Sequence, residues 1–527
     1  MNFSRKLPIG IQSFENLRQS NYLYVDKTKD IFNLVHAGKV YFLSRPRRFG
    51  KSLLISTLQA YFEGKRELFE GLAIVDLEKD NPLAWKPCPV LKFSLASGEF
   101  TKPNGLRTAL ADSLKTFEEK YELPSESSDL VSRFKNALKS AFKKTGERVA
   151  VLVDEYDNPL LKNLAGNSQQ EDENKSLYKG FFAALKDYDD YLRFALFTGV
   201  TKFSKVSIFS DLNQLQDISL SVEYEKICGI TQQELENNFP PEIEDMAKKY
   251  GCSYDECVAE LKRMYDGYHF SENMTDMYNP FSLLNAFANK KFRNYWFESG
   301  TPTFLIKKLR ESDFDIKKFS ADDIFADASA ISDYCPDNPD IIPLFFQTGY
   351  LTIKGYDEKY ESYALGYPNA EVKYGFINSL APEYLSEKSA SPLDIRSFGL
   401  DVDNGRPNEF MERFKAIFAN LPYPAGEAVD HVTEQNFQNA IYIIFMLLGK
   451  FVRTEIHSAK GRADCIVETD GYVYIFEFKR DVPAIEALKQ IDEQGYAAPY
   501  SADSRKLFKI GVNFSTSERN ISEWLVR

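Results

Sequence analysis

The chain has 527 residues, which is too long for one hydrophobic core and predicts three or four domains. Hydrophobic residues make up 43% and charged residues 27%, an ordinary composition for a soluble globular protein. The net charge of −12 provides no global basic field, so it weighs against avid nonspecific DNA binding, although a local basic groove is compatible with an acidic total.

The chain carries no sign of a membrane segment or of an oxidising compartment. Its longest apolar run, residues 441–448, is far below the roughly 20 residues that span a bilayer. The first eight residues lack the apolar stretch of a signal peptide. Six cysteines show neither Cys-x-x-Cys pairs nor zinc-like spacing, which favours reduced thiols. We therefore expect a cytoplasmic protein without membrane contact.

The first half alternates strand-like and helix-like segments. Strands are expected at residues 40–43, 90–95, 149–153 and 191–197, and a helix at residues 52–62. This alternation predicts an α/β domain with a mostly parallel sheet over residues 1–230.

Helical signals dominate after residue 230. Thr231–Glu234 and Ser253–Glu256 are capping boxes, and Asn279-Pro280 opens a further helix. Residues 231–385 are therefore expected to form a helical middle domain. Composition leaves two alternatives open for it, a helical lid and a winged-helix-like domain.

The last part of the chain predicts a compact α/β unit. Residues 386–408 are rich in Ser, Asp, Pro, Gly and Asn, which favours a linker. A helical stripe at residues 437–448 precedes strands at 463–467 and 472–478 and a helix at 483–496. We assign residues 409–527 to this C-terminal domain.

A candidate phosphate-binding loop follows the first strand. Gly50, Lys51 and Ser52 stand between a strand and a helix, which is where a turn of backbone N–H groups, a lysine and a magnesium-binding hydroxyl cradle phosphates. Position 45, where the usual pattern has glycine, is Arg45. The alternative interpretation of this segment is a basic surface turn.

Acidic residues at the end of a later strand support the phosphate-binding interpretation. Asp154 and Glu155 follow the apolar strand 149–153, where an aspartate can hold Mg²⁺ and a glutamate can polarise water. Such a pair is often only a solvated turn, but its coupling to an upstream Gly-Lys-Ser favours a nucleotide site. Thr198, at the end of the next strand, is a candidate γ-phosphate sensor.

A second candidate site lies near the C-terminus. Asp464 and Glu477 fall on two strands joined by the turn 469–471, and Lys479 shares a strand face with Glu477. Carboxylates hold Mg²⁺ and a lysine orients water in phosphodiester cleavage. The alternative is a hairpin with charges on its exposed face, but charges in so apolar a strand are costly unless paired or metal-bound.

These segments together resemble a known family. Residues 24–28, 45–52, 153–157, 197–205, 278–282 and 345–351 are similar to the prokaryotic AAA-ATPase-like family, whose members carry a C-terminal PD-(D/E)XK nuclease domain. Gly461–Asp464 and Glu477–Lys479 match the nuclease pattern residue for residue. The resemblance covers essentially the whole chain, and the family replaces the first loop glycine, so Arg45 is expected.

The resemblance implies a P-loop NTPase of the class with an extra strand between its two nucleotide motifs, and an active nuclease. Its implied cofactors are ATP and Mg²⁺, with Lys51 on the β- and γ-phosphates, Ser52 and Asp154 on the metal, and Glu155 as the base. Arg47 and Arg48 either neutralise phosphate charge or pin the loop. Asp464 and Glu477 would hold the nuclease metal, with Lys479 as a catalytic residue.

Four further side chains are weaker candidates. Glu434 and Gln438 precede the nuclease site, and Gln490 and Tyr496 follow it in a family Gln…Tyr pattern. Ordinary helix-surface chemistry explains each of them equally well. Glu455 is assigned a structural or supporting role and Cys465 a core position.

Two functions remain open from the sequence. The first is an ATP- and Mg²⁺-dependent nuclease that acts on nucleic acid, with DNA favoured over RNA, in defence or mobile-element biology. The second is a nucleotide-switched regulatory or nucleic-acid-binding protein with little turnover. No arginine finger is assignable, so assembly into a homo-oligomer stays an open expectation.

Overall fold

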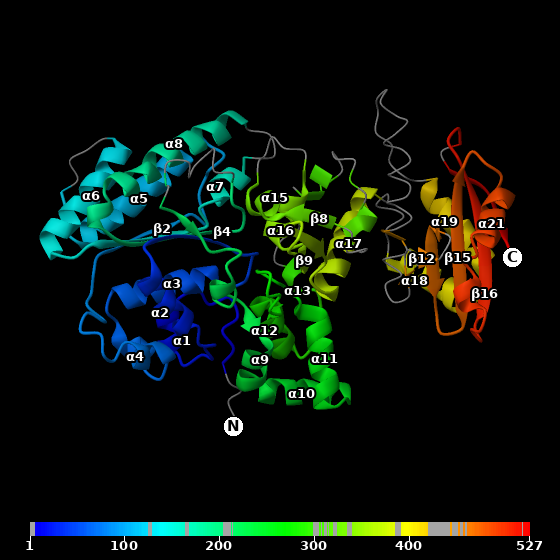
Figure 1. The fold of residues 1–527 in the computed structure, drawn as a ribbon, viewed down its shortest axis with the longest axis horizontal. Helices are drawn as coiled ribbons and strands as arrows, with labels where there is room; N and C mark the ends of the chain where they lie inside the picture. Colours follow the sequence, from blue (N-terminus) through cyan, green and yellow to red (C-terminus); the bar gives the residue numbers. More distant parts are fainter. Residues whose placement is uncertain are drawn as a thin grey trace. The chain divides into compact units, whose positions relative to one another are not determined.

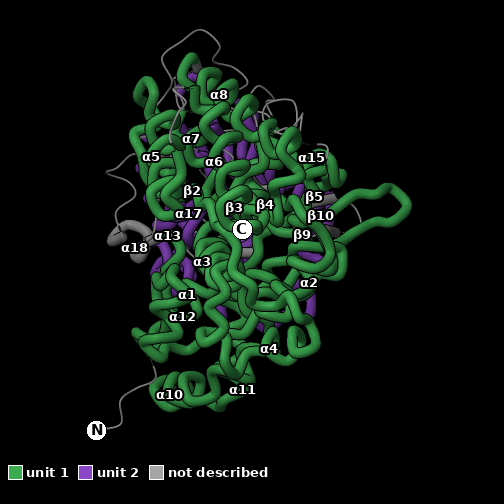
Figure 2. Tube along the Cα trace, turned by 90° about the vertical axis from the view of Figure 1, so that its left-hand side faces the viewer, with its two compact units in different colours: residues 1–300, 322–372 green, residues 301–321, 373–527 purple. Residues whose placement is uncertain are grey.

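The structure is a computed structural model in which two compact units are described separately. It describes residues 6–124, 129–163, 168–203, 214–298, 324–334, 340–384, 392–419 and 461–527 apart from 519, with a few residues between these ranges, namely 212 and positions within 305–319 and 443–458. Unit 1 comprises residues 1–300 and 322–372, and unit 2 comprises residues 301–321 and 373–527 (Figure 2). The domain boundaries expected from the sequence stay predictions.

Unit 1 is built on a five-stranded parallel sheet. Its order is β2-β3-β4-β1-β5, and every described pairing in it is parallel. The strands are β1 (Val40–Ser44), β2 (Val90–Ser94), β3 (Val149–Asp154), β4 (Leu192–Gly199) and β5 (Gln216–Asp217). The four strands expected from the sequence are confirmed, and β4 lies between β1 and β3 as the family resemblance implies. The two-residue β5 is too short to leave a pattern.

Helices cover both faces of this sheet (Figure 1). The buried run of β3 has both faces covered, as central strands of parallel sheets require. The helix α3 (Lys51–Phe62) lies on one side, and α5 (Gly105–Lys120), α6 (Leu130–Thr145) and α8 (Ser168–Asp187) lie on the other. The shorter helices of this region are α1 (Phe14–Gln19), α2 (Thr28–Ala37), α4 (Ala73–Leu77) and α7 (Asn158–Leu161).

A helical bundle follows the sheet within unit 1. It contains α9 (Gln232–Asn238), α10 (Pro240–Tyr250), α11 (Tyr254–Tyr265) and α12 (Pro280–Asn289). Both expected capping boxes are present, since the Thr231 and Ser253 hydroxyls each accept a backbone N–H and the glutamates three residues later bond back. Asn279 caps α12. The short strands β6 (Ile230–Thr231) and β7 (Met277–Tyr278) pair beside it.

The end of unit 1 is less helical than the sequence predicts. It runs β8 (Ile324–Asp327), α15 (Ala328–Ser332), α16 (Ile342–Thr348), β9 (Thr352–Asp357) and β10 (Ser362–Gly366), with the antiparallel sheet order β8-β10-β9. This arrangement resembles a winged helix, in which a strand and two helices precede a hairpin. The last strand of the hairpin, here β10, lies in the middle of the sheet. We call residues 324–334 and 340–366 the winged-helix-like unit for this arrangement, and the choice between a helical lid and a winged-helix-like domain for the middle of the chain stays a prediction.

Unit 2 carries a mixed five-stranded sheet of order β11-β14-β15-β16-β17. Its strands are β11 (Val452–Arg453), β14 (Cys465–Glu468), β15 (Tyr472–Arg480), β16 (Lys506–Ser515) and β17 (Asn520–Val526), and β12 (His457–Ser458) pairs separately with β13 (Gly461–Arg462). The helix α21 (Ala484–Glu493) contributes to the core of one face, and aromatic rings of α19 (Pro407–Phe418) contact the other. The expected hairpin and following helix are confirmed.

The expected linker at residues 386–408 is not an irregular segment where the structure describes it. Residues 392–403 form α18 (Pro392–Asp403), and α19 begins at Pro407. Phe398 and Val402 are buried four residues apart, and Phe398 packs its ring on Phe410 and Phe414. This apolar spacing outweighs the turn-rich composition.

Two sequence expectations meet the limits of the described residues. The helix expected at 437–448 lies outside them except for residues 443 and 444. Within the described part of the chain, none of the helices combines the length and apolarity needed to cross a bilayer.

Candidate nucleotide and metal sites

The candidate phosphate loop connects the carboxyl end of β1 to α3. Gly50 caps α3 with φ +96°, a left-handed conformation that favours glycine. The Lys51 Nζ donates to the carbonyls of Arg45 and Pro46 at 2.8 and 3.0 Å, so the lysine folds back over the loop. Burial lowers the pKa of Lys51, while Asp157 and Asp154 act in the opposite direction.

Arg45 does not point at the phosphate position. Its side chain is buried, and its guanidinium donates to the carbonyls of Ser44, Ser219 and Tyr224 at 2.9, 2.7 and 3.1 Å. The guanidinium also lies 4.2 Å from the centre of the Phe270 ring. Burial lowers the pKa of Arg45 to about 10, so it stays charged at neutral pH. Arg45 therefore anchors the loop from behind.

Arg47 and Arg48 are both exposed and line the same cavity as Lys51. Arg48 has φ +68° and stacks its guanidinium 4.8 Å from the centre of the Phe281 ring. The Arg47 carbonyl accepts the Trp296 indole N–H at 3.2 Å. Their backbone and stacking contacts fit loop pinning, and their exposed charge fits phosphate neutralisation, so both alternatives stay predictions.

The expected acidic group stands beside this loop at the carboxyl end of β3. Asp154 is buried and accepts the Thr198 hydroxyl at 2.8 Å, which ties β3 to β4. Glu155 has φ +55°, and burial raises its pKa despite the nearby Lys51 charge. A left-handed non-glycine residue in a pocket is a form of strain that proteins often retain at functional sites.

Asp157, which has no assigned role in the sequence pattern, completes this group. Its carboxylate is buried and accepts the backbone N–H groups of Val200 and Thr201 at 2.9 and 2.7 Å. Burial raises the pKa of Asp157 to about 6. A Cβ on Gly199 would lie 2.7 Å from this carboxylate, so glycine permits the close approach. The sequence did offer one indication of this residue, because Asp157 is the third acidic residue in segment 153–157.

Tyr156 connects the same two strand ends. Its buried hydroxyl donates to the Thr201 carbonyl at 2.9 Å and accepts the Phe203 N–H at 3.0 Å. We expect Tyr156→Phe to destabilise the fold by about 1–3 kcal/mol because it leaves a buried donor and acceptor unpaired. Urea unfolding measures this, and Tyr360→Phe, at a 68% exposed position, is the control expected to change nothing. Equal stability of the two variants would contradict the assignment.

These groups open into one cavity of about 490 Å³ within unit 1. Its polar end carries Lys51, Ser52, Glu155 and Asp157. The cavity is also lined by apolar side chains from the N-terminal segment, from α2 and from the helical bundle. They include Ile11, Val25, Ile31, Phe239, Phe281 and Leu284. A polar end at the carboxyl edge of a parallel sheet and an apolar end of this size fit a nucleotide.

The candidate nuclease residues lie together in unit 2. The antiparallel register of β14 and β15 brings Asp464 next to β15, and its carboxylate accepts the Phe478 N–H at 2.8 Å. Glu477 is 2% exposed, and its Oε1 lies 3.0 Å from the Lys479 Nζ. The exposed-hairpin alternative therefore fails for Glu477, which is a buried carboxylate beside a lysine.

The donors at this position fit a divalent cation. Oε2 of Glu477 is buried and has no hydrogen-bond partner among the residues that the structure describes. An unpaired buried carboxylate oxygen is costly, and a hard cation is an effective partner for it. The described ranges contain no group of three His, Cys, Asp or Glu that would complete a metal site. Glu434 and Glu455 lie outside the described residues.

Glu477 is expected to make the stability of unit 2 depend on pH. Burial, and then the charge of Asp464, raise its pKa to about 7 from an ordinary 4.5. A raised carboxyl pKa stabilises the fold below pH 4.5, and this contribution is lost as pH rises through 7. At 1.36 kcal/mol per pKa unit, the loss is about 3 kcal/mol in the absence of a divalent cation.

The matched variant isolates this effect. We expect Glu477→Gln to be more stable than the wild type above pH 7 in EDTA and to differ little near pH 4.5. Thermal unfolding of both proteins between pH 4.5 and 8 measures the difference. Added Mg²⁺ should stabilise only the wild type at pH 8, whereas parallel curves for both proteins would refute the expectation.

The remaining candidates have weaker support. Gln490 and Tyr496 approach each other at 3.5 Å, with Tyr496 buried in the core beside α21. Cys465 is buried as expected for a core residue. Gln438 lies outside the described residues.

Comparison with known proteins identifies both halves of the chain. A family model described as "Predicted AAA-ATPase" matches residues 8–209, and a model for the PD-(D/E)XK nuclease superfamily matches residues 432–524. A curated protein of Azotobacter chroococcum mcd 1, named "Uncharacterized protein in vnfD 5'region", is 36% identical over 539 residues that cover 99% of each chain. The chain therefore belongs to the family of predicted AAA-ATPases that carry a C-terminal PD-(D/E)XK nuclease domain.

Proposed function

We propose that unit 1 binds ATP with Mg²⁺ and hydrolyses it. The observation that carries the proposal is the arrangement of Lys51, Glu155 and Asp157 around one cavity at the carboxyl edge of the sheet. Lys51 would exchange its two loop carbonyls for phosphate oxygens, and Gly50 would permit the turn. Magnesium, when bound, would be held by Ser52 and Asp154 and would neutralise phosphate charge.

The other residues of the cavity have distinct roles in the proposal. Glu155 orients and deprotonates the attacking water, and its raised pKa makes it a better base than an ordinary carboxylate. Thr198 contacts Asp154 and senses the γ-phosphate through it. Arg47 and Arg48 offer charge at the cavity mouth. If hydrolysis needs a further arginine, a second copy of the chain would supply it.

We propose further that unit 2 cleaves nucleic acid with Mg²⁺, with DNA favoured over RNA. The unpaired Glu477 oxygen beside Asp464 and Lys479 carries this part. Asp464 and Glu477 would hold the cation, which polarises the phosphodiester when bound. Lys479 would position the water and lower its pKa. A role in genome defence or mobile elements rests on the domain pairing alone.

The cytoplasm is the proposed location. Its support is that the described cysteines, at 88, 228, 252, 257 and 465, form no disulfide with one another.

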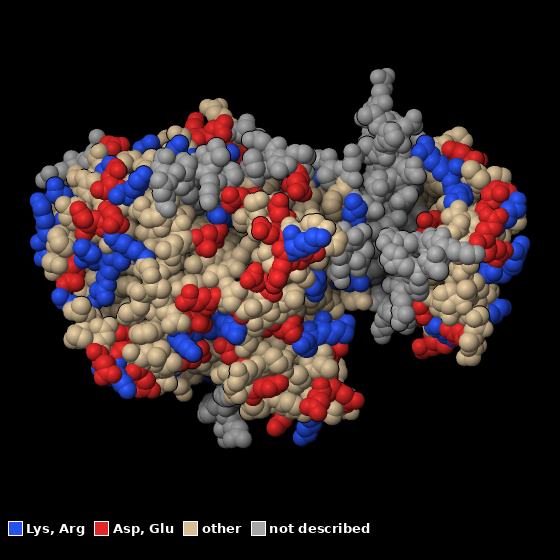
Figure 3. All heavy atoms as spheres, in the orientation of Figure 1, with Lys and Arg blue, Asp and Glu red and all other residues tan. Residues whose placement is uncertain are grey.

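A nucleotide-switched regulator with little turnover is the second candidate. The net charge of −12 favours it, and on the face in Figure 3 acidic and basic side chains are interspersed over both units. Such a surface provides little nonspecific attraction for a polyanion. In that case the nuclease fold would serve recognition.

One panel separates the two candidates. Single- and double-stranded DNA and RNA are incubated with the wild type, Lys51→Ala and Lys479→Ala, with Mg²⁺ and with or without ATP. Metal-dependent cleavage that depends on Lys479 supports the nuclease. The regulator is supported if the protein retains ATP tightly, releases no phosphate and cleaves none of the substrates.

A further inference from the structure

The last two residues of β4 and the four that follow it connect the proposed nucleotide site to the winged-helix-like unit. We call residues 198–203 the β4 strap. On one side the strap bonds the acidic group, through Thr198 to Asp154 and through the N–H groups of Val200 and Thr201 to Asp157. Each of these bonds lies within hydrogen-bond distance, so a displacement of the acidic group is transmitted to the strap.

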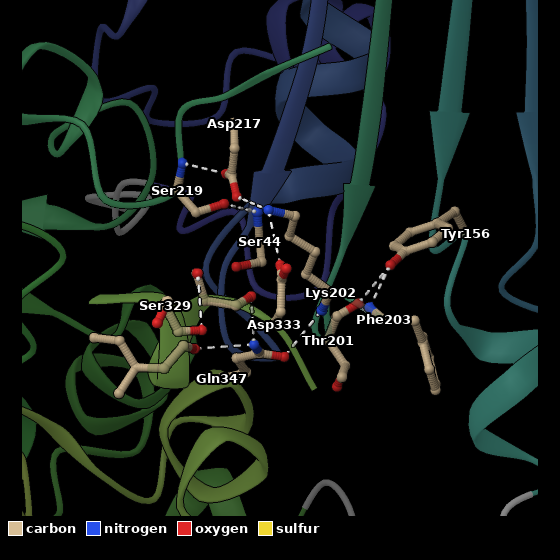
Figure 4. A network of polar contacts seen from close by, with 12 residues as sticks. Ser44, Tyr156, Thr201, Lys202, Phe203, Asp217, Ser219, Ser329, Asp333 and Gln347 are labelled. Carbon is tan, nitrogen blue, oxygen red and sulfur yellow. Dashed lines mark hydrogen bonds and ion pairs between the residues drawn. The ribbon is translucent and has the colours of Figure 1, made fainter. Parts of the chain in front are cut away.

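Lys202 connects the other side of the strap to the winged-helix-like unit (Figure 4). The residue is 4% exposed, and its Nζ lies 2.6 Å from Asp217 on β5 and 3.0 Å from Asp333 after α15. Burial alone would lower the pKa of Lys202, but the two carboxylates raise it above its ordinary value. The Lys202 carbonyl accepts the Tyr334 N–H at 2.8 Å. Loss of this cation would leave two carboxylates facing each other.

Gln347 on α16 completes the connection. Its side-chain oxygen accepts the Lys202 backbone N–H at 2.9 Å. Its side-chain nitrogen donates to the carbonyls of Ile331 and Ser332 at 3.0 and 2.8 Å. One buried amide thus fixes the strap, α15 and α16 together (Figure 4).

The turn after α16 contacts the phosphate loop as well. Gly349 has φ +89°, and a Cβ there would lie 2.6 Å from the Pro46 ring. The next residue, Tyr350, packs its ring 5.1 Å from that of Trp296, which donates to the Arg47 carbonyl. Residues 347–350 therefore contact both the strap and the phosphate loop.

We propose that the winged-helix-like unit regulates ATP hydrolysis through the β4 strap, with Lys202 and Gln347 as the positioning residues that couple them. The proposal rests on the proposed ATPase function and adds its regulation. Gln347 on α16, the second of the two helices, contacts the β4 strap. The position of α16 therefore responds to whether ATP is bound. Neither positioning residue lines the cavity, and both act through the acidic group.

The test compares ATP affinity with turnover. Lys202→Met and Gln347→Met should lower kcat about tenfold or more, because displacement of the strap misplaces Asp154 and Glu155. The Kd for ATP should stay within about threefold, since neither side chain lines the cavity. Lys202→Arg should restore most of kcat because it keeps the cation between Asp217 and Asp333.

Arg133→Met is the matched control. Arg133 on α6 forms an ion pair with Glu118 on α5, with 2.6 Å between the two charged groups. The side chains of Arg133 and Glu118 are 17% and 5% exposed. Arg133 does not line the cavity and lies outside the strap. We expect its kcat to remain at the wild-type value. Unchanged kcat in both methionine variants, or an equal loss in Arg133→Met, would overturn the proposal.

Hydrogen exchange separates this proposal from the proposed function. ATP should slow exchange of the α16 amides in the wild type but not in Lys202→Met, which still binds ATP. If the wild type binds ATP without hydrolysing it, the proposed ATPase activity is refuted. The coupling between the nucleotide site and α16 is then decided by the hydrogen exchange of the α16 amides. ATP binding without any change at α16 would overturn the coupling alone.

Discussion

Lys479→Ala is expected to lower metal-dependent cleavage of nucleic acid by at least about 100-fold, the lower range for loss of an acid–base residue. The lysine Nζ lies 3.0 Å from the buried Glu477 carboxylate. Its removal would take away the ammonium group proposed to orient water and would let the pKa of Glu477 rise further, which would also weaken the proposed binding of Mg²⁺. A gel assay on labelled DNA with Mg²⁺ measures the initial rates.

The controls for this variant use the same chain. Lys489→Ala, on α21 and paired with Glu486 at the surface, should cleave at the wild-type rate. ATP hydrolysis by Lys479→Ala should stay normal, because Lys479 belongs to unit 2 and the nucleotide cavity to unit 1. Cleavage by Lys479→Ala at the wild-type rate would exclude the proposed nuclease site.

Lys51→Ala is expected to weaken ATP binding roughly 10- to 150-fold. This range corresponds to about 1.5–3 kcal/mol for a hydrogen bond to a charged group. The cavity around Lys51 also holds Glu155 and Asp157, so without the lysine a bound triphosphate would face carboxylates with less compensation. Isothermal titration with Mg-ATP measures Kd directly.

Lys65→Ala provides the comparison for this prediction. Lys65 pairs with Glu15 at 2.7 Å and does not line the cavity. Its affinity for ATP should equal that of the wild type. Equal affinity of Lys51→Ala and Lys65→Ala would place the nucleotide elsewhere, and the roles of Ser52 and Asp154 would fail with that of Lys51.

Four of the five strands in the sheet of unit 1 were predictable because they are largely apolar runs. Val149–Asp154 is such a run, and its buried pattern follows from coverage on both faces. The capping boxes at Thr231 and Ser253 were equally local, since each depends on residues three positions apart. Local patterns of this kind can be read without knowing the fold.

Long-range partners were not predictable in the same way. Two of the three carbonyl partners of Arg45 come from Ser219 and Tyr224, more than 170 positions away. Asp157 accepts N–H groups from the end of another strand, and Lys202 faces carboxylates from β5 and from beyond α15. Only the fold determines which distant groups satisfy a buried charge.

The nuclease half shows the same division. The spacing of Asp464, Glu477 and Lys479 predicted their proximity through hairpin geometry alone. The helix at 392–403 was missed because its turn-forming residues mask the apolar pair Phe398 and Val402. Composition describes a segment on average, whereas burial depends on which face each residue occupies.

The buried Arg45 also limits how this loop can change over evolution. Three carbonyls and an aromatic face are arranged around its guanidinium, so a glycine at this position would remove the donor that these groups share, although the Tyr224 carbonyl would keep the Ile227 N–H. We therefore expect a change from arginine to glycine at this position to destabilise the loop unless the groups around the guanidinium change with it. In a chain with arginine at this position, the buried groups around the guanidinium therefore select against its replacement.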